Sequence, residues 1–250
     1  MRKTAVILIS AMMSLLVMAG NEKTLWDEAA KSYADKNYED AVSQYQQLVQ
    51  MGESADLYYN YANALFKAGY TGRAILYYER ALRLDPSNED IKYNLEFANL
   101  SKTDKIDKVD PFFVVEWYAN ITNLMTSNRW AVISLVLLFL TMVMFLTYRF
   151  GSVLVLRKTA FGLAIVCFVL SIAFAGHAFY SRNRVVNSPE AILMVGSETA
   201  RSTPDESGTE VFVIHEGSKV KIKSTLSEWS EVQLEDGSVG WIRSNSVELI

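Results

Sequence analysis

The sequence has little of the chemistry that disulfides, metal sites and nucleophilic catalysis require. Its 250 residues include one cysteine, Cys167, and two histidines, His177 and His215. A single cysteine forms no intrachain disulfide, and the two histidines lie in unlike surroundings, so no Ser/His/Asp, Cys/His or metal-ligand set comes together. The chain also lacks a glycine-rich phosphate loop. These absences predict a protein that is not an enzyme, with no catalytic residues, metal or cofactor.

Charge is missing from two long stretches of the chain. Residues 130–148 and 159–180 contain no Asp, Glu, Lys or Arg. At about 1.5 Å per helical residue they extend roughly 28 Å and 33 Å, enough to cross a hydrocarbon core about 30 Å thick. The pattern predicts a transmembrane hairpin with a connector at residues 149–158. The absence of charge inside the spans leaves no visible parts for an ion or proton pathway.

The connector carries Arg149, Arg157 and Lys158 and no acidic residue. Short cytoplasmic loops hold an excess of positive charge, so we expect the connector in the cytoplasm and both flanking modules outside it. Residues 1–19 have a basic start and then an apolar run, which predicts a secretory signal peptide. An uncleaved N-terminal anchor is the alternative, and it gives the same topology. Together these features predict a bacterial inner-membrane protein whose two soluble modules are periplasmic.

The modules on either side of the hairpin are acidic. Residues 21–110 hold 16 Asp or Glu against 11 Lys or Arg, and residues 181–250 hold 11 against 7. Negative surfaces are repelled by phosphate backbones, which argues against nucleic-acid binding. Protein partners or cell-wall material are the expected ligands.

The first module contains an internal repeat. Residues 22–54 match residues 55–88 at a shift of 33, and small or aromatic residues coincide. A repeat of this length indicates a stacked helical array. We therefore predict helical repeats over residues 21–109, ending in a closing helix that starts near Asn88. The coinciding pairs are Ala29 with Ala62, Tyr33 with Phe66, Ala41 with Ala74, and Tyr45 with Tyr78.

The second repeat resembles tetratricopeptide repeats. Its matching residues are Ala62, Gly69, Ala74, Tyr78, Ala81 and Pro86. The resemblance implies an all-α array with a concave groove that binds a peptide or a partner helix. The groove residues that it implies are Tyr59, Asn60, Asn63, Phe66 and Asn94. Asp90 stands where a carboxylate-binding repeat would have Lys, which disfavours an acidic peptide tail. The alternative is that the array is only a spacer.

Residues 110–128 connect the array to the first span. Glu116, Asn120 and Asn123 share one helical face, and apolar residues cover much of the rest. This pattern predicts an amphipathic linker helix. Either the helix lies at the outer membrane interface, or it packs against the hairpin.

Strand signals replace the helical period in residues 190–250, with turns at Glu216-Gly217 and Asp236-Gly237. Five strands are expected, at residues 191–195, 211–214, 219–223, 229–234 and 239–242, in a small all-β barrel. The segments 216–220, 228–232 and 236–242 resemble bacterial SH3 domains. The resemblance implies binding of cell-wall peptides or proteins, with Trp229 and Trp241 as ligand contacts or as barrel packing. His215 is expected to be a surface or packing residue.

The whole order of modules is similar to the BatE proteins of the Bacteroides aerotolerance group. That resemblance implies a membrane scaffold that works with partner proteins carrying von Willebrand factor A domains in envelope or oxidative stress. The predicted fold is thus a multidomain membrane protein with a tetratricopeptide array, a two-helix transmembrane hairpin and an SH3-like barrel. Two functional hypotheses remain: a scaffold that binds a protein through the array, or a tether or sensor that binds peptidoglycan through the barrel.

Overall fold

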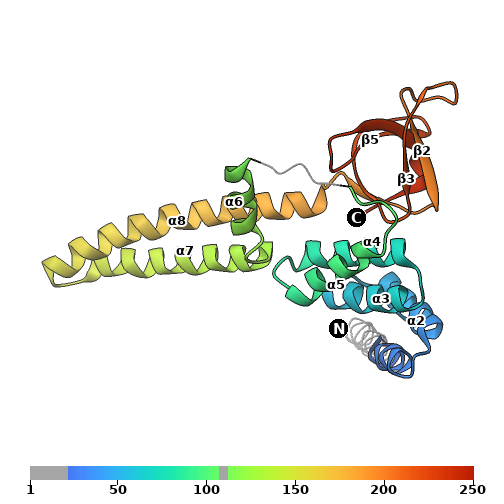
Figure 1. Ribbon diagram of the computed structural model, residues 1–250. Coiled ribbons are helices and arrows are strands. Elements are labelled where there is room, and N and C mark those ends of the chain that lie inside the picture. The colour runs from blue at the N-terminus through green and yellow to red at the C-terminus, as the bar shows by residue number, and fades with distance from the viewer. Residues whose placement is uncertain (1–21, 107–111) are drawn as a thin grey trace, which may run out of the picture. The chain divides into compact units, whose positions relative to one another are not determined.

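A computed structural model describes residues 22–106 and 112–250. The predicted signal peptide, residues 1–19, and the start of the predicted linker, Asp110 and Pro111, lie outside these described residues. Contacts divide the chain into two compact units (Figure 1). One unit holds the helical array and the C-terminal strands, and the other holds the long apolar helices. This division places the two soluble modules together in one unit.

The helical array consists of five successive helices, as the repeat predicts. Ser54 and Asn88 cap the helices that follow them, each accepting a backbone N–H with its side-chain oxygen. Gly69 supplies a φ of +92° in the turn between the two helices of the second repeat. The buried small residues Ala62, Ala74 and Ala81 let these helices approach closely. The helices are residues 22–34, α2 (Tyr38–Met51), α3 (Ala55–Lys67), α4 (Thr71–Leu84) and α5 (Glu89–Leu100).

The second unit contains a helical hairpin of α7 (Ser127–Phe150) and α8 (Leu154–Val186). Both helices are long and apolar enough to cross a membrane, and most of their apolar residues are not buried. Ser134 and Ser171 each donate a hydroxyl hydrogen bond of 2.9 Å to the other's backbone carbonyl. Such paired hydroxyls hold helices together where no water competes. The hairpin therefore presents an apolar surface, and the two serine hydroxyls between its helices are hydrogen-bonded.

The helices extend beyond the predicted spans, so the connector is shorter than expected. Only residues 151–153 are non-helical, although residues 149–158 were predicted as the loop. The apolar stretch corresponds only to the part of each helix that fits the hydrocarbon core. Backbone hydrogen bonding continues beyond it into polar residues. At about 1.5 Å per residue the 33 residues of α8 measure roughly 50 Å, well beyond the hydrocarbon thickness.

The predicted linker helix is α6 (Phe113–Thr122), which ends before Thr126 caps α7. It lies across the hairpin (Figure 1), and the Tyr118 hydroxyl contacts His177 Nδ1 at 3.0 Å. His177 also packs edge-on against the Trp130 ring, at 4.8 Å between centroids. These contacts fit packing against the hairpin. Apolar side chains such as Phe113 and Trp117 remain exposed, so the interface alternative stays open as well.

The C-terminal module is a seven-stranded antiparallel sheet that curls into a barrel (Figure 1). Five strands were predicted, and β2 and β7 were missed. The β2 sequence Ser-Glu-Thr-Ala-Arg lacks an apolar alternation, and β7 is only three residues long. Both strands exist because the sheet pairs them with neighbours. The strands are β1 (Glu190–Leu193), β2 (Ser197–Arg201), β3 (Glu210–His215), β4 (Lys219–Leu226), β5 (Trp229–Gln233), β6 (Val239–Arg243) and β7 (Val247–Leu249).

The barrel packs directly on helix α4 of the array. Ile192, Met194 and Ile250 join the apolar core that the helices build, which includes Ile75 and Leu76 of α4. Ile106, which comes after the array, in turn packs on the core of the barrel. Burying these side chains removes apolar surface from water on both modules. The joint is thus a continuation of two hydrophobic cores.

Polar side chains fix the orientation of the joint. Lys219 of β4 forms ion pairs with Glu79 of α4, at 3.1 Å, and with Glu190 of β1, at 3.0 Å. Burial alone would lower the pKa of Lys219, but the two carboxylates outweigh it and raise that pKa. Arg80 Nη2 donates to Glu248 Oε1 at 3.0 Å and to the Leu249 carbonyl at 2.6 Å. Lys219 and Arg80 therefore each have defined acidic partners across the joint.

Two glycines allow the barrel to come close to the start of α4. A Cβ on Gly72 would lie 2.4 Å from Glu216 Cγ, and one on Gly217 would lie 3.0 Å from Ile75 Cδ1. Gly217 also adopts a φ of +86°, which disfavours other residues. Glu216 Oε1 accepts the Gly72 backbone N–H at 3.1 Å. A carboxylate from the barrel thus satisfies a backbone donor in the first turn of α4.

We expect Lys219→Ala to destabilise the soluble unit by about 2 kcal/mol, because it removes the half-buried cation that pairs with both Glu79 and Glu190. In the detergent-solubilised protein, the melting temperature followed by tryptophan fluorescence would fall by about 5 °C. Lys223→Ala is the matched control, since Lys223 is an exposed lysine of the same strand. Equal melting temperatures for the two variants would contradict this account of the joint.

Candidate functional site

The predicted groove residues lie on α3 and α5, and the structure ties most of them to one another. Asn94 Nδ2 donates to the Tyr59 hydroxyl at 3.0 Å and to Asn63 Oδ1 at 2.9 Å. The Tyr78 hydroxyl of α4 donates to the same Asn63 oxygen at 2.6 Å. Burial, with smaller effects from neighbouring tyrosines, raises the pKa of Tyr78. The network therefore stays neutral and locks three helices together.

This network assigns a supporting role to two of the predicted contacts. The side-chain amides of Asn63 and Asn94 form hydrogen bonds within the array. These bonds fix the positions of the neighbouring aromatic rings. Asn60 Nδ2 donates to the Asp56 carbonyl of its own helix at 2.8 Å. Phe66 is half-buried and contacts Phe97 edge-on, at 5.7 Å between ring centroids. We infer that the rings, rather than the amides, dominate this surface.

Three residues of α5 were not predicted as part of the surface. The side chains of Tyr93, Phe97 and Leu100 are 70%, 52% and 68% exposed. Their spacing of four and three residues places them on one helical face, a signal that the sequence already contained. The sequence analysis gave these three residues no separate role. We call the surface formed by Tyr59, Phe66, Tyr93, Phe97 and Leu100 the first-helix face.

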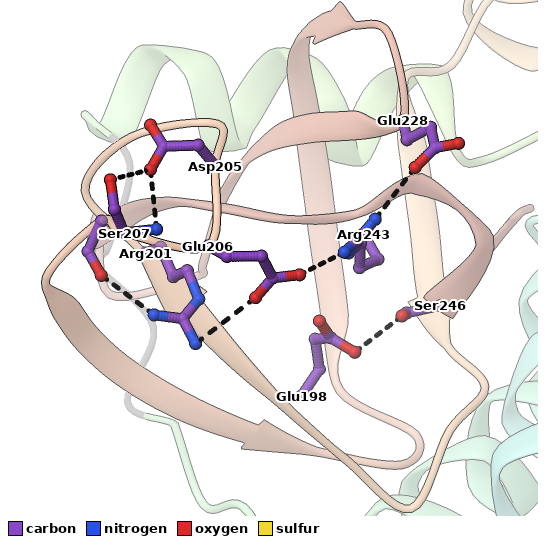
Figure 2. Close-up of polar contacts among 9 residues, drawn as sticks. Glu198, Arg201, Asp205, Glu206, Ser207, Glu228, Arg243 and Ser246 are labelled. Carbon is purple, nitrogen blue, oxygen red and sulfur yellow. Dashed lines mark hydrogen bonds and ion pairs between the residues drawn. The ribbon is translucent and has the colours of Figure 1, made fainter.

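The barrel carries a charged cluster above one of its predicted ligand residues. The Arg243 guanidinium lies 4.7 Å from the centre of the Trp229 ring, and Trp229 is only 8% exposed. Glu228 accepts from Arg243 Nη1 at 3.0 Å, and Glu206 forms an ion pair with Arg243 Nη2 (Figure 2). Trp229 therefore serves mainly as packing beneath a cation. The structure leaves more of Trp241 exposed, so that residue stays the better predicted contact.

The loop between β2 and β3 is held by the same charges. Glu206 reaches Arg243 from this loop and also lies 3.8 Å from Arg201 Nη2, while Arg201 Nη1 donates to the Gly208 carbonyl at 3.0 Å (Figure 2). Asp205 accepts from the backbone N–H and the hydroxyl of Ser207. Exposed ion pairs contribute little stability each, but a connected set restrains a loop. Arg201, Glu206 and Arg243 thus form an ordered polar surface, and other residues of the barrel contact α4.

His215 has a partner that sequence reasoning missed. Asp104, just beyond α5, accepts from the His215 backbone N–H at 2.6 Å and the Ser218 hydroxyl at 2.7 Å, and it contacts His215 Nδ1 at 2.7 Å. A hydrolytic triad requires the histidine between the serine and the carboxylate. Here both side chains bind the carboxylate, so the histidine does not activate the serine. The three residues form a structural link between the array and the barrel.

The electrostatics of Asp104 support that structural role. Burial would raise its pKa, but hydrogen bonds from Ser218 and from the backbone and ring of His215 together lower it. Within residues 22–106 and 112–250, no group of three or more His, Cys, Asp or Glu side chains is arranged to hold a metal ion.

Comparisons with known proteins match both soluble modules. Residues 55–88 match the tetratricopeptide repeat family, and residues 199–248 match the bacterial SH3 domain family. A TPR repeat-containing protein of Methanocaldococcus jannaschii is 35% identical over 66 residues, which are 26% of this chain and 21% of that protein. The chain thus spans about a fifth of the length of this relative. Both matched families are typically non-catalytic binding modules: tetratricopeptide repeats bind proteins, and bacterial SH3 domains can bind peptidoglycan.

Acid should weaken the link at Asp104. A carboxyl whose folded pKa lies below its unfolded value of 3.8 stabilises the fold above that value and loses the contribution as pH falls through the folded pKa. We expect Asp104→Asn to lower the melting temperature at pH 7 and to reduce the further loss between pH 5 and about pH 3. Glu210→Gln, at an exposed position of β3, is the control. Parallel melting curves for wild type and Asp104→Asn across this range would contradict the assignment.

Proposed function

We propose that this protein is a non-enzymatic membrane scaffold whose helical array binds a protein partner through the first-helix face. The single observation that supports this most is the exposed apolar surface of α5, which the Asn63 and Asn94 hydrogen bonds hold in place beside α3. Exposed apolar surface on a folded domain marks interaction sites. The match of the second repeat to a family of protein-binding repeats supports the same proposal.

The joint between array and barrel supports a hairpin topology. The two modules lie on opposite sides of α7 and α8 in the sequence, yet they share cores and ion pairs. Residues in contact must lie on the same side of a bilayer, so the chain crosses the bilayer an even number of times between them. Two apolar helices meet that condition. In this proposal the short connector lies alone on the opposite side.

Charge supports the direction of insertion. Arg149, Arg157 and Lys158 flank the connector, and no acidic residue accompanies them. By the positive-inside tendency, the connector is cytoplasmic and both modules are periplasmic, at a bacterial inner membrane. A signal peptide at residues 1–19 fits this orientation, because it directs export of the helical array that comes directly after it in the chain.

The order of modules supports a BatE-like role within this proposal. An array, a hairpin and an SH3-like barrel in succession suit a scaffold that gathers other membrane proteins, such as those with von Willebrand factor A domains, in tolerance of envelope or oxidative stress. The described residues offer no redox group in the soluble modules, since Cys167 lies within α8. A role in oxygen tolerance would therefore act through the partners.

The second candidate function is a cell-wall tether. The family match of residues 199–248 and the polar surface around Arg201, Arg243 and Trp241 favour it, because peptidoglycan peptides offer both carboxylates and amides. That surface lies away from the joint with α4 and is free to meet a ligand. The connector, in contrast, offers little surface for passing a signal to the cytoplasm.

Cysteine accessibility tests the topology. In a Cys167→Ser background, we expect a membrane-impermeant maleimide to label Glu96→Cys and Thr225→Cys on cells with a permeabilised outer membrane. Ser152→Cys should react only after lysis. Labelling of the first two positions from opposite sides would contradict the shared compartment. Labelling of position 152 alone on unlysed cells would reverse the orientation and keep the hairpin.

Site-specific photo-cross-linking tests the partner. With p-benzoylphenylalanine at Tyr93, we expect irradiated cells to yield a discrete protein adduct, because that side chain lies in the first-helix face. Met51 is the control, since it is an exposed apolar residue at the end of α2 and outside that face. Failure of Tyr93 to give an adduct beyond the Met51 pattern would contradict the scaffold. Adducts at Trp241 that muramidase digestion releases would favour the tether.

A further inference from the structure

We infer that the first-helix face takes an apolar segment of another protein that carries a lysine or arginine. The inference rests on the proposed function and specifies the chemistry of the partner. It depends on two observations: how the side chains of α5 divide around the helix, and where acidic groups lie beside the exposed rings.

Helix α5 has three distinct stripes. Ile91, Leu95 and Ala98 are buried in the array. On one side of them lies a polar stripe of Lys92, Glu96 and Asn99, of which Lys92 and Glu96 are exposed. On the other lies the exposed apolar stripe of Tyr93, Phe97 and Leu100. The end of a repeat array is normally closed by a polar outer surface.

A shift of 34 residues places Lys92, Glu96 and Asn99 where α3 has Tyr58, Ala62 and Leu65, which are buried within the array, so a further helix would add on the polar stripe. The apolar stripe is therefore not the unfinished edge of the array. It points to the same side as the face of α3, because Phe97 contacts Phe66 and Asn94 contacts Tyr59. A bound ligand, rather than another repeat, therefore explains why this apolar stripe is exposed.

The same residue types recur in neighbouring helices. A shift of 34 residues relates Asp56 to Asp90, Tyr59 to Tyr93 and Phe66 to Leu100. Upstream, Trp26 and Tyr33 are partly buried and pack on the core of the array. Large apolar side chains at equivalent positions of α3 and α5, joined by the contact of Phe66 with Phe97, form one surface rather than isolated apolar residues. One extended or helical segment can contact several rings at once.

Acidic groups accompany these rings. Asp56 and Asp90 lie in the first turns of α3 and α5, both are exposed or partly exposed, and neither forms an ion pair with a cation in the described part of the chain. Lys92 pairs with Glu89 on the neighbouring stripe, at 2.8 Å. Lys67, at the far end of α3, is the one cation beside the face among the described residues of α3 and α5.

A basic group on the partner meets favourable sites here. The carboxylates attract it, and the faces of Tyr59 and Tyr93 offer cation–π contacts. An acidic segment would instead meet like charge at Asp56 and Asp90. A neutral apolar segment would gain the ring contacts alone. The expected order of affinity is therefore basic, then neutral, then acidic.

The test uses the full-length protein in nanodiscs and three fluorescein-labelled synthetic peptides. The peptides are ten residues long, rich in Leu and Phe, and differ only in two central positions, which are Lys, Gln or Glu. Fluorescence anisotropy should give the Lys peptide at least about tenfold tighter binding than the Glu peptide. Asp56→Asn with Asp90→Asn should bring the three affinities together. Tyr93→Ser with Phe97→Ser should weaken all three peptides about tenfold.

Lys92→Ala with Glu96→Ala is the matched control, since it changes the adjacent stripe of α5, and it should leave the binding order unchanged. Melting temperatures check that every variant is folded. Equal binding of the Lys and Glu peptides, or wild-type binding by the Tyr93→Ser, Phe97→Ser variant, would overturn the inference. If that happened while the Tyr93 cross-link to a protein persisted in cells, the proposed function would stand with another partner chemistry. Loss of both signals would overturn both.

Discussion

The contact between one face of α4 and the barrel is the constraint on which the rest of this structure depends. Apolar side chains from both modules share one core there, and Lys219 sits between carboxylates from each. Because the contact joins segments on either side of the hairpin in sequence, it sets the compartment of both modules together. It also decides which surfaces remain available. The first-helix face lies on other helices, and the Arg243 cluster lies on other strands.

In both soluble modules, polar side chains hold neighbouring aromatic side chains in fixed positions. The amides of Asn63 and Asn94 are consumed in holding α3, α4 and α5, and the exposed rings gain a fixed position from them. On the barrel, Arg243 covers Trp229, and acidic residues hold Arg243. Surfaces arranged in this way bind at a smaller entropic cost, because their side chains are ordered before a ligand arrives.

Local sequence patterns predicted the helices and most of the strands. The remaining features depend on contacts between residues that are distant in the sequence. The repeat with Gly69, the closing helix after Asn88 and the two long apolar helices each depend on neighbouring residues, and each was predicted. Strand β2 was missed because its polar sequence becomes a strand only by pairing with β3 and β6.

The candidate sites divide in the same way. The apolar stripe of α5 was present in the sequence as a helical spacing, although it was not predicted as a binding surface. Asp104 lies 111 residues from His215, so no local signal relates them. The burial of Trp229 under Arg243 likewise depends on a neighbouring strand, and the sequence left both packing and ligand contact open for it. The predicted role of Trp241 remains a prediction.

The carboxylate of Glu216 at the first turn of α4 has a consequence for biogenesis. A ribosome makes α4 long before it makes Glu216, and both apolar helices are synthesised in between. During that interval, the face of α4 that contains Ile75 and Leu76 is not covered by the barrel. A chaperone that shields this face, or rapid insertion of the hairpin, would shorten the period of exposure. The barrel, which is translated last, completes the packing of the helical array, which is translated first.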